Sequence, residues 1–352
     1  MTRTEPAQQT PAETGQTSAG PAQQTELAQQ SMEPAQALAA AARRALRAPS
    51  ILNTQPWRWR VRGDELELFA DSSRQLTSID PTGRLLTLSC GAALHHARVA
   101  LTATGYDASV ERFPNPDDED LLARIRIVGQ HEPPERALDD LEAMRRRHTD
   151  RRPFAATVPV PAPAVAALSR AADDEDAWLH QIPVDDVPAL AAAVERAAAA
   201  EARMDAYQTD LREWTHRPRA AGDGVTAEAV TAHMALPVHL RDFSGEETLL
   251  DPGFGNDRFA TFLVLGTAND TRYDWLRGGE ATSAVWLTAT TLGLVASVMS
   301  DVTEVPEARE LVRHLLSTSG HPQLVFRVGV DMQPPPYPKS ARRSPSEVIE
   351  MA

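Results

Sequence analysis

The sequence predicts an α+β fold made of two pseudo-symmetric halves, and two features of the chain support this. Trp57, Trp59 and Val61 alternate with arginines, and a Gly63-Asp64 turn leads into a second strand, which predicts an antiparallel hairpin. A repeat offset by 188 residues also aligns small residues in both copies: Gly105 with Gly293, Gly91 with Gly279, Ala93 with Ala281, Thr102 with Thr290, and Ala108-Ser109-Val110 with Ala296-Ser297-Val298. Each copy reads as a helix, a stopping glycine and a strand, so we expect related halves joined near residue 135.

The order of elements in the first half follows from capping and periodicity. Residues 1–33 are polar and Ala-rich, bury too little apolar surface to offset chain entropy, and are expected to be a disordered tail. The first half, residues 34–134, is expected to contain a helix over 34–47, strands over 55–62 and 65–70, a helix over 82–104, and strands over 107–113 and 121–128.

The second half, residues 135–352, carries longer connections. Its expected elements are helices over 135–147 and 163–172, a long Ala-rich helix over 185–215, a strand over 259–266, a helix over 275–292 and a strand over 323–330. Residues 215–255 are rich in Gly and Pro, and we expect them to form a lid, called here the lid segment. Residues 331–352 form a Pro-rich and basic C-terminal arm.

Composition limits the possible partners. The chain has 352 residues, 42% of them hydrophobic, and a net charge of −14, which supports a substantial core and argues against a nucleic-acid partner. Its single cysteine, Cys90, excludes an intramolecular disulfide and fits a reducing cytoplasm. Neither a membrane-spanning run nor a signal peptide is recognisable, so we expect a cytoplasmic protein without a membrane partner.

Several common functional motifs are missing from the sequence. It has no Gly-x-Gly-x-x-Gly after a strand, no Gly-Lys-Ser/Thr, no Gly-x-Ser-x-Gly and no His-Glu-x-x-His. His95 and His96 point about 100° apart on a helix, a poor geometry for one metal, so we expect one packed and one solvated histidine and no metal site. Cys90 is expected in the core, and His233 and His239 of the lid segment are expected to be solvated.

Two polar stretches remain for chemistry. The polar loop, residues 48–57, offers Ser50, Asn53 and Gln55 as donors and acceptors, although such residues also simply satisfy backbone groups at a helix end. The basic run, residues 145–154, concentrates positive charge in an acidic protein, although cations also favour the C-terminal pole of a helix.

Together these stretches resemble the FMN-dependent nitroreductase family. Ser50, Asn53, Gln55, Pro56 and Trp57 match its Pro-Ser-x-x-Asn-x-Gln-Pro-Trp motif. Three further segments are similar to that family: Arg147-His148-Thr149 with Arg151 and Phe154 to its Arg-x-Ser phosphate motif, residues 279–299 to its helix, Gly-Leu turn and strand beneath the flavin, and residues 342–349 to its C-terminal basic segment.

The two motifs occur in different halves, which departs from the ordinary family pattern of a homodimer of short chains. This arrangement resembles the dormancy-associated, Acg-type branch, in which two fused halves form an intramolecular pseudo-dimer. The resemblance implies one flavin per chain and a monomeric functional unit. On the opposite side of the pseudo-twofold, the run Asp173-Asp174-Glu175-Asp176 is expected to repel a phosphate or flavin anion.

The resemblance implies FMN as the cofactor and assigns its contacts. Ser50, Asn53 and Gln55 would serve the ring or ribityl chain. Arg147 and Thr149, with one or both of Arg342 and Arg343, would bind the phosphate, and the Met299-Ser300 backbone would pass near flavin N5. The full expected cofactor-binding set is Ser50, Asn53, Gln55, Arg147, His148, Thr149, Arg151, Met299, Ser300, Arg342 and Arg343. No protein side chain is expected to act as a catalytic acid or base, since the flavin carries the hydride chemistry.

The leading functional hypothesis is an NAD(P)H-dependent oxidoreductase acting on nitroaromatic or quinone-like acceptors. A second hypothesis is an FMN storage or sequestration protein whose lid segment excludes substrates. A third is a cofactor-free homologue that acts as a binding module. Retention of flavin on purification excludes the third hypothesis, and reduction by NADPH separates the first two.

Overall fold

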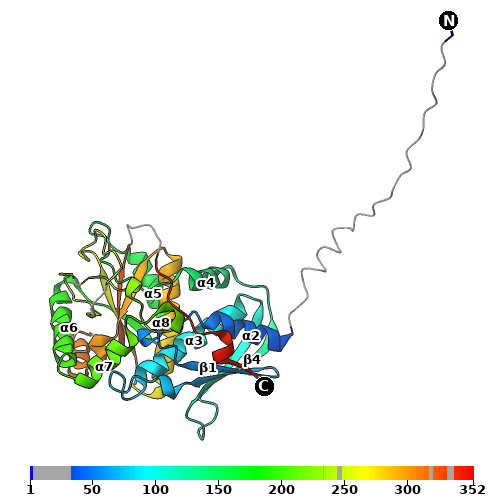
Figure 1. Cartoon of the computed structure of the whole chain (residues 1–352), viewed down its shortest axis with the longest axis horizontal. Helices are drawn as coiled ribbons and strands as arrows, with labels where there is room; N and C mark the ends of the chain where they lie inside the picture. Colours follow the sequence, from blue (N-terminus) through cyan, green and yellow to red (C-terminus); the bar gives the residue numbers. More distant parts are fainter. Residues whose placement is uncertain (3–32, 233, 244–247, 317–319, 331–336) are drawn as a thin grey trace. The chain divides into compact units, whose positions relative to one another are not determined.

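The computed structural model of the chain describes residues 1–2, 33–232, 234–243, 248–316, 320–330 and 337–352. By its internal contacts the chain divides into Met1–Glu33 and Pro34–Ala352, and the second unit holds all the helices and strands described here (Figure 1). Most of the predicted tail, and His233, lie outside the described residues. In the part of the chain that is described, no helix is both long and apolar enough to cross a membrane.

Two sheets share one strand order. The first sheet has the order β3-β4-β2-β1-β9, and the second has β7-β8-β6-β5 when read in the same direction. The first four strands pair antiparallel in each sheet, whereas β9 pairs parallel to β1. The strands are β1 (Trp57–Arg62), β2 (Glu65–Ala70), β3 (Tyr106–Arg112), β4 (Leu121–Gln130), β5 (Trp178–Gln181), β6 (Thr261–Thr267), β7 (Val295–Met299), β8 (His321–Gly329) and β9 (Ile349–Met351).

The helices surround these sheets. Those of the first half are α2 (Pro34–Ala45) and α3 (Arg84–Thr102). Those that follow are α4 (Glu135–Arg146), α5 (Ala162–Asp173), α6 (Val187–Glu201), α7 (Asp205–Trp214), α8 (Arg272–Thr291), α9 (Asp301–Glu304), α10 (Pro306–His314) and α11 (Pro345–Val348). Hydrophobic residues of α2 and α3 pack on the first sheet, those of α5 and α8 on one face of the second sheet, and those of α6 and α10 on its other face.

The repeat seen in the sequence has a structural counterpart. The series β1, β2, α3, β3, β4 recurs as β5, β6, α8, β7, β8, with the same pairing order. Gly105 and Gly293 end the two equivalent helices with φ of 84° and 72°, so their predicted role as stopping glycines is confirmed. The boundary predicted near residue 135 stays a prediction.

The two equivalent helices cross at equivalent glycines. Helices α3 and α8 pack against each other (Figure 1), and a Cβ on Gly91 would overlap the carbonyl oxygen of Leu276. Reciprocally, a Cβ on Gly279 would overlap the carbonyl oxygen of Leu88. Both pairs are related by the 188-residue offset, so the crossing has the reciprocity of a twofold contact.

The largest difference from the predicted elements lies between β5 and β6. The helix predicted over 185–215 is broken into α6 and α7, with Met204 in an extended conformation between them. The break redirects the chain so that Tyr207 of α7 can donate a hydrogen bond to Glu304. In the described part of the lid segment, short 3₁₀ turns form, together with isolated β-bridges between Thr215 and Val225 and between Thr231 and Leu250. The strands β5 and β9 and the helices α9 and α10 were not predicted.

Candidate functional site

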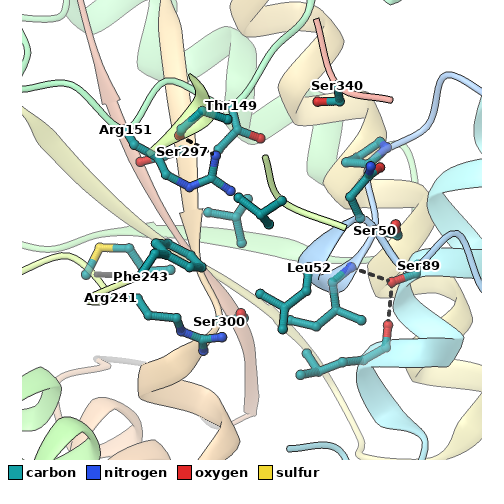
Figure 2. A pocket seen from close by; sticks show the side chains of 18 of the residues that line it. Ser50, Leu52, Ser89, Thr149, Arg151, Arg241, Phe243, Ser297, Ser300 and Ser340 are labelled. Atoms are coloured by element: carbon teal, nitrogen blue, oxygen red, sulfur yellow. Dashed lines mark hydrogen bonds between the residues drawn. The ribbon is translucent and has the colours of Figure 1, made fainter. Parts of the chain in front are cut away.

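A pocket enclosing about 1380 Å³, including its open mouth, lies where both parts of the repeat meet the lid segment. Its walls come from the polar loop, α3, the basic run, the lid segment, α8, β7 and the C-terminal arm. Figure 2 shows Ser50, Leu52 and Ser89 on one side of the pocket, with Arg151, Arg241 and Phe243 across from them. The pocket therefore combines hydroxyls, guanidinium groups and apolar side chains, as pockets for organic anions commonly do.

The polar loop is held in an unusual backbone conformation. Leu52, Asn53 and Gln55 have φ values of 41°, 55° and 49°, in the left-handed region that non-glycine residues rarely adopt. The Ser50 hydroxyl accepts a hydrogen bond from the Gln55 amide at 2.9 Å, and the Ser89 hydroxyl of α3 accepts one from the Ile51 amide at 3.1 Å. These bonds hold the loop in a conformation that is costly without them, which is typical of functional sites.

The amide side chains of this loop fasten other segments to it. Asn53 Nδ2 donates to the Gly224 carbonyl oxygen at 3.0 Å, and Gln55 Nε2 donates to that of Gly222 at 2.8 Å. Gln55 Oε1 accepts from the Arg343 amide at 3.0 Å, while Asn53 Oδ1 accepts from Arg342 Nη1 at 2.7 Å. Asn53 lines the pocket. Gln55 is fully buried, does not line the pocket, and is hydrogen-bonded to the lid segment and the C-terminal arm.

Arg147, which ends α4, is a buried cation with free donors. Only 9% of the residue is exposed, and its Nη2 donates a long bond of 3.3 Å to the Arg47 carbonyl oxygen. Its Nε and Nη1 atoms have no hydrogen-bond partner among the described residues, and its guanidinium lies 4.6 Å from the centre of the Trp286 ring. Burial, and then repulsion by Arg342, lower the pKa of Arg147 to about 9.

Two other pocket arginines also lack a carboxylate partner among the described residues. Burial, followed by the charge of Arg47, lowers the pKa of Arg342 to about 10. Burial, followed by the charge of Arg241, lowers the pKa of Arg151 to about 10, and the Arg151 guanidinium lies 4.9 Å from the Phe243 ring centre. The positive charges of Arg147, Arg151 and Arg342 are thus available to a bound anion.

Eight of the eleven predicted cofactor-binding residues line this pocket. They are Ser50, Asn53, Arg147, Thr149, Arg151, Met299, Ser300 and Arg342. Gln55, His148 and Arg343 do not line it. His148 stacks on Tyr337 with ring centres 3.6 Å apart, and Arg343 lies 3.4 Å from the Asp71 carboxylate.

Sequence reasoning missed several pocket residues. Ser89 on α3 and the lid-segment residues Arg241 and Phe243 carried no motif that marked them. Trp286 on α8 lies within residues 279–299, which were marked by resemblance, but it was not itself predicted as a site residue. The repeat offered a signal for Ser89, because the 188-residue offset places the α8 helix, which bears Trp286, on the α3 helix, which bears Ser89.

The predictions for His95, His96 and Cys90 can be checked. The expectation that one histidine is solvated is wrong, since both are buried where α3 meets α8. His95 Nδ1 lies 2.8 Å from the Ser283 hydroxyl, and burial lowers the pKa of His95 to about 3. Cys90 is confirmed as a core residue, with the pKa of its thiol raised by burial. His239 is half-buried, not freely solvated. In the described part of the chain, no group of three or more potential ligands could hold a metal.

The region that the 188-residue offset relates to the pocket is filled by ion pairs. Arg277 contacts Glu175 at 2.9 Å and Glu280 at 3.1 Å, and Arg98 contacts the same two carboxylates at 2.7 and 2.8 Å. Arg112 adds a contact to Glu280 at 2.7 Å. The expectation that the acidic run presents uncompensated charge is therefore wrong for Glu175, which is buried, and for Asp176, which pairs with Arg277.

These ion-pair residues are the repeat equivalents of pocket residues. The 188-residue offset relates the members as follows: Ser89 to Arg277, Ala92 to Glu280, Arg98 to Trp286, and Arg112 to Ser300. Charged side chains thus occupy on one side the space that remains open on the other. The two sides share the same order of strands and helices, but one side is an open pocket and the other is filled by charged side chains.

No family model matches the chain. The chain is 38% identical over 316 residues to "Putative NAD(P)H nitroreductase Rv3131" of Mycobacterium tuberculosis, covering 87% of this chain and 89% of that protein. It is 36% identical over 312 residues to "Putative NAD(P)H nitroreductase acg" of the same organism, covering 87% and 93%.

Solved structures were also compared. A nitroreductase with bound FMN from Bacteroides fragilis is 15% identical, has a TM-score of 0.37, and is matched over 58% of this chain and 95% of that one. A nitroreductase with bound FMN from Desulfitobacterium hafniense is 12% identical, with a TM-score of 0.38 and coverage of 60% and 96%. At these TM-scores the family assignment depends on the sequence relatives.

Proposed function

The chain belongs to the nitroreductase family, and on that premise we propose that it is an FMN-binding oxidoreductase that takes hydride from NAD(P)H. Its acceptors are nitroaromatic or quinone-like compounds. The bound FMN would supply the hydride chemistry, and the protein would bind and orient the flavin and limit the access of water.

The observation that carries this proposal is Arg147. Two of its buried nitrogen donors have no partner among the described residues, and they belong to a residue in the wall of the pocket. A buried cation with free donors is unfavourable unless an anion satisfies it, and a phosphate monoester supplies both charge and acceptor oxygens. Thr149 and Arg342 line the same pocket and would add a hydroxyl and a second guanidinium.

The rest of the pocket suits a flat, amphipathic ring. Leu52, Leu85, Leu88 and Leu324 supply apolar surface, and the hydroxyls of Ser50, Ser297 and Ser300 supply hydrogen-bonding partners. Polar groups around a flavin ring tune its redox behaviour, whereas apolar surface stabilises its stacked faces.

We also propose one FMN per chain and a monomeric functional unit. The open pocket takes residues from both parts of the repeat, so a second chain is not needed to complete it. The equivalent volume on the other side is occupied by Arg98, Arg112, Arg277 and their carboxylate partners, which leaves no room for a second flavin.

Anaerobic rapid mixing of the purified, flavin-loaded protein with NADPH tests the proposal. We expect flavin absorbance to bleach at a rate that increases with NADPH, and then to return when a nitroaromatic compound or a quinone is added. Protein that retains FMN but is reduced by neither NADH nor NADPH would contradict the oxidoreductase assignment. Protein that binds no FMN would leave only a cofactor-free binding module.

The structure favours FMN storage as a second candidate through one feature, the fastening of the lid segment. Asp223 of this segment pairs with Arg74 and lies 2.8 Å from Arg217, and Gly222 and Gly224 are bonded to the polar loop. Hydride transfer needs direct contact between nicotinamide and flavin, so a permanently fastened lid would prevent it.

Loosening or shortening this segment separates the two candidates. For a storage protein, Asp223→Asn or deletion of the lid tip should raise the rate of reduction by NADPH at least tenfold, with FMN retained. Asp251→Asn, a change of an exposed residue near the end of the same segment, is the matched control. Equal rates in wild type and both lid variants would contradict gating by the lid segment.

A further inference from the structure

Among the described residues that line the pocket, one is acidic. Asp301 lines it directly after Ser300, and among the described lining residues there is no other Asp or Glu and no His, Cys, Tyr or Lys. Asp301 is 4% exposed, so bulk water has little access to its carboxyl group. Among the described lining residues, Asp301 is the one whose side chain is of a type that commonly acts as a general acid.

A buried cluster extends from Asp301 away from the pocket. Glu304, at the other end of α9, pairs with Arg241 of the lid segment at 2.6 Å. The Tyr207 hydroxyl of α7 donates a hydrogen bond to the second oxygen of Glu304, also at 2.6 Å. Glu201, at the end of α6, interacts electrostatically with Arg241, Glu304 and Asp301, so the cluster joins the pocket wall to α6 and α7.

The balance of charges in this cluster favours protonated carboxyl groups. It has three carboxyl groups and one guanidinium, and Glu304 takes the guanidinium. Glu201 is 6% exposed, and its Oε1 has no hydrogen-bond partner among the described residues. Burial raises the pKa of Glu201 to about 7 and raises the pKa of Asp301 despite the charge of Arg241.

Other charged groups border the cluster without neutralising these two acids. Arg84 of α3 and Asp80, which precedes it, interact electrostatically with Glu304, and they are of opposite charge. Arg151 faces Arg241 from the basic run and repels it. Arg241, which already pairs with Glu304, is therefore the cation that most strongly favours the ionised form of both acids.

We propose that Asp301 donates the proton that completes reduction of the acceptor, and that Glu201 holds the proton that restores it. This inference rests on the proposed function. Reduction of a quinone to a hydroquinone takes one hydride, which comes from the reduced flavin, and one proton, which leaves the Asp301 carboxyl group for the second quinone oxygen. The Asp301 carboxylate then regains a proton from the cluster of Glu201, Tyr207 and Glu304, and solvent restores Glu201.

The first measurement is independent of activity. Infrared spectra of FMN-loaded protein at pH 7 should show absorption from protonated carboxyl groups. One component of this absorption should be absent from the spectrum of Asp301→Asn. A second component should be absent in Glu201→Gln. Spectra identical in wild type and Asp301→Asn would mean that Asp301 carries no proton, and would overturn the proposal.

The second measurement follows reoxidation of the flavin. Protein reduced with dithionite is mixed anaerobically with a water-soluble benzoquinone over a range of pH. We expect Asp301→Asn to be about 100-fold slower than wild type near neutral pH, as for loss of a general acid, and to lose the wild-type decline of the rate with rising pH. Glu201→Gln, which keeps Asp301, should shift that decline to a different pH.

Glu307→Gln is the matched control, since Glu307 is exposed in the first turn of α10 and lies outside the cluster. It should match wild type in both measurements. Wild-type reoxidation that is unaffected by Asp301→Asn, in rate and in pH profile, would refute the role of Asp301. Wild type that is not reoxidised by any quinone or nitroaromatic acceptor would instead refute the proposed function, and this inference with it.

Discussion

Replacing Arg147 with methionine should have opposite effects on FMN affinity and on the stability of the apoprotein. Methionine keeps most of the length and apolar surface of the arginine stem but removes its charge and donors. In the apoprotein two donors of the buried guanidinium have no partner among the residues that the structure describes, so removing the guanidinium relieves an unfavourable group. In the FMN complex the same donors are expected to bind the phosphate, so their removal weakens binding.

The magnitudes follow from these contacts. Charge-assisted hydrogen bonds contribute about 1.5 to 3 kcal/mol each, and Thr149 and Arg342 remain, so we expect a net loss of about 2 kcal/mol, or about thirtyfold in affinity. The lowering of the Arg147 pKa to about 9 reflects a burial penalty of a few kcal/mol. Removing the guanidinium also removes its contact with Trp286, worth about 1 to 2 kcal/mol, which offsets part of the relieved burial penalty. The unfolding free energy of the apoprotein should therefore rise by an amount on the order of 1 kcal/mol.

Fluorescence titration with FMN and urea unfolding of the apoprotein measure the two effects. Arg146→Met is the control, because the neighbouring Arg146 is exposed in the last turn of α4 and should change neither quantity. If Arg147→Met binds FMN as tightly as wild type does, the basic run is only a helix end. If it instead destabilises the apoprotein by several kcal/mol, Arg147 serves the fold and not the cofactor.

Three further predictions concern other parts of the fold. Burial raises the pKa of Glu201 from 4.5 to about 7, so the unfolding free energy of wild type should fall between these pH values and then level off. Glu201→Gln should remove this fall and be more stable than wild type above pH 7 by up to about 3 kcal/mol. Urea unfolding with the same pH dependence in both proteins would contradict this. Gly91→Ala should lower the unfolding free energy by about 2 kcal/mol or more through overpacking, because the new Cβ would overlap the Leu276 carbonyl oxygen. A variant as stable as wild type would show that the helices do not meet there. Glu280→Ala should lower the unfolding free energy by about 3 to 5 kcal/mol, because the buried Arg277 and the partly buried Arg98 and Arg112 would each lose a carboxylate partner. A smaller loss in calorimetry would show that water enters the cluster.

Much of the architecture was predictable because local patterns and tertiary structure agree. The alternation in β1 places tryptophans on the buried face, and the glycines after α3 and α8 adopt the left-handed conformation that a helix end uses. The repeat was visible because the helix crossing tolerates only glycine at residues 91 and 279.

The parts that were missed depend on contacts between distant segments. The strand β9 forms because residues 349–351 reach β1, which nothing in their own sequence predicts. The break between α6 and α7 is hidden by a long run of good helix formers. Gln55 fits the family motif, yet its amide holds Gly222 and Arg343 and does not line the pocket, since a motif gives residue types but not the direction of a side chain.

The filled side of the pseudo-twofold could not be read from the sequence for a similar reason. The acidic run containing Glu175 looked repulsive because Arg98 and Arg277 lie far from it along the chain. Only folding brings these charges together, and their pairing changes a repulsive surface into a buried, neutralised cluster.

The central claim is that one chain builds one flavin site from both parts of its repeat. Light scattering coupled to absorbance, on protein saturated with FMN and then freed of excess flavin, measures the mass of the particle and its flavin content together. We expect one FMN per 38.3 kDa chain and a particle of that mass that stays yellow on dilution. Two flavins per chain, or loss of flavin whenever a dimer dissociates into single chains, would contradict it.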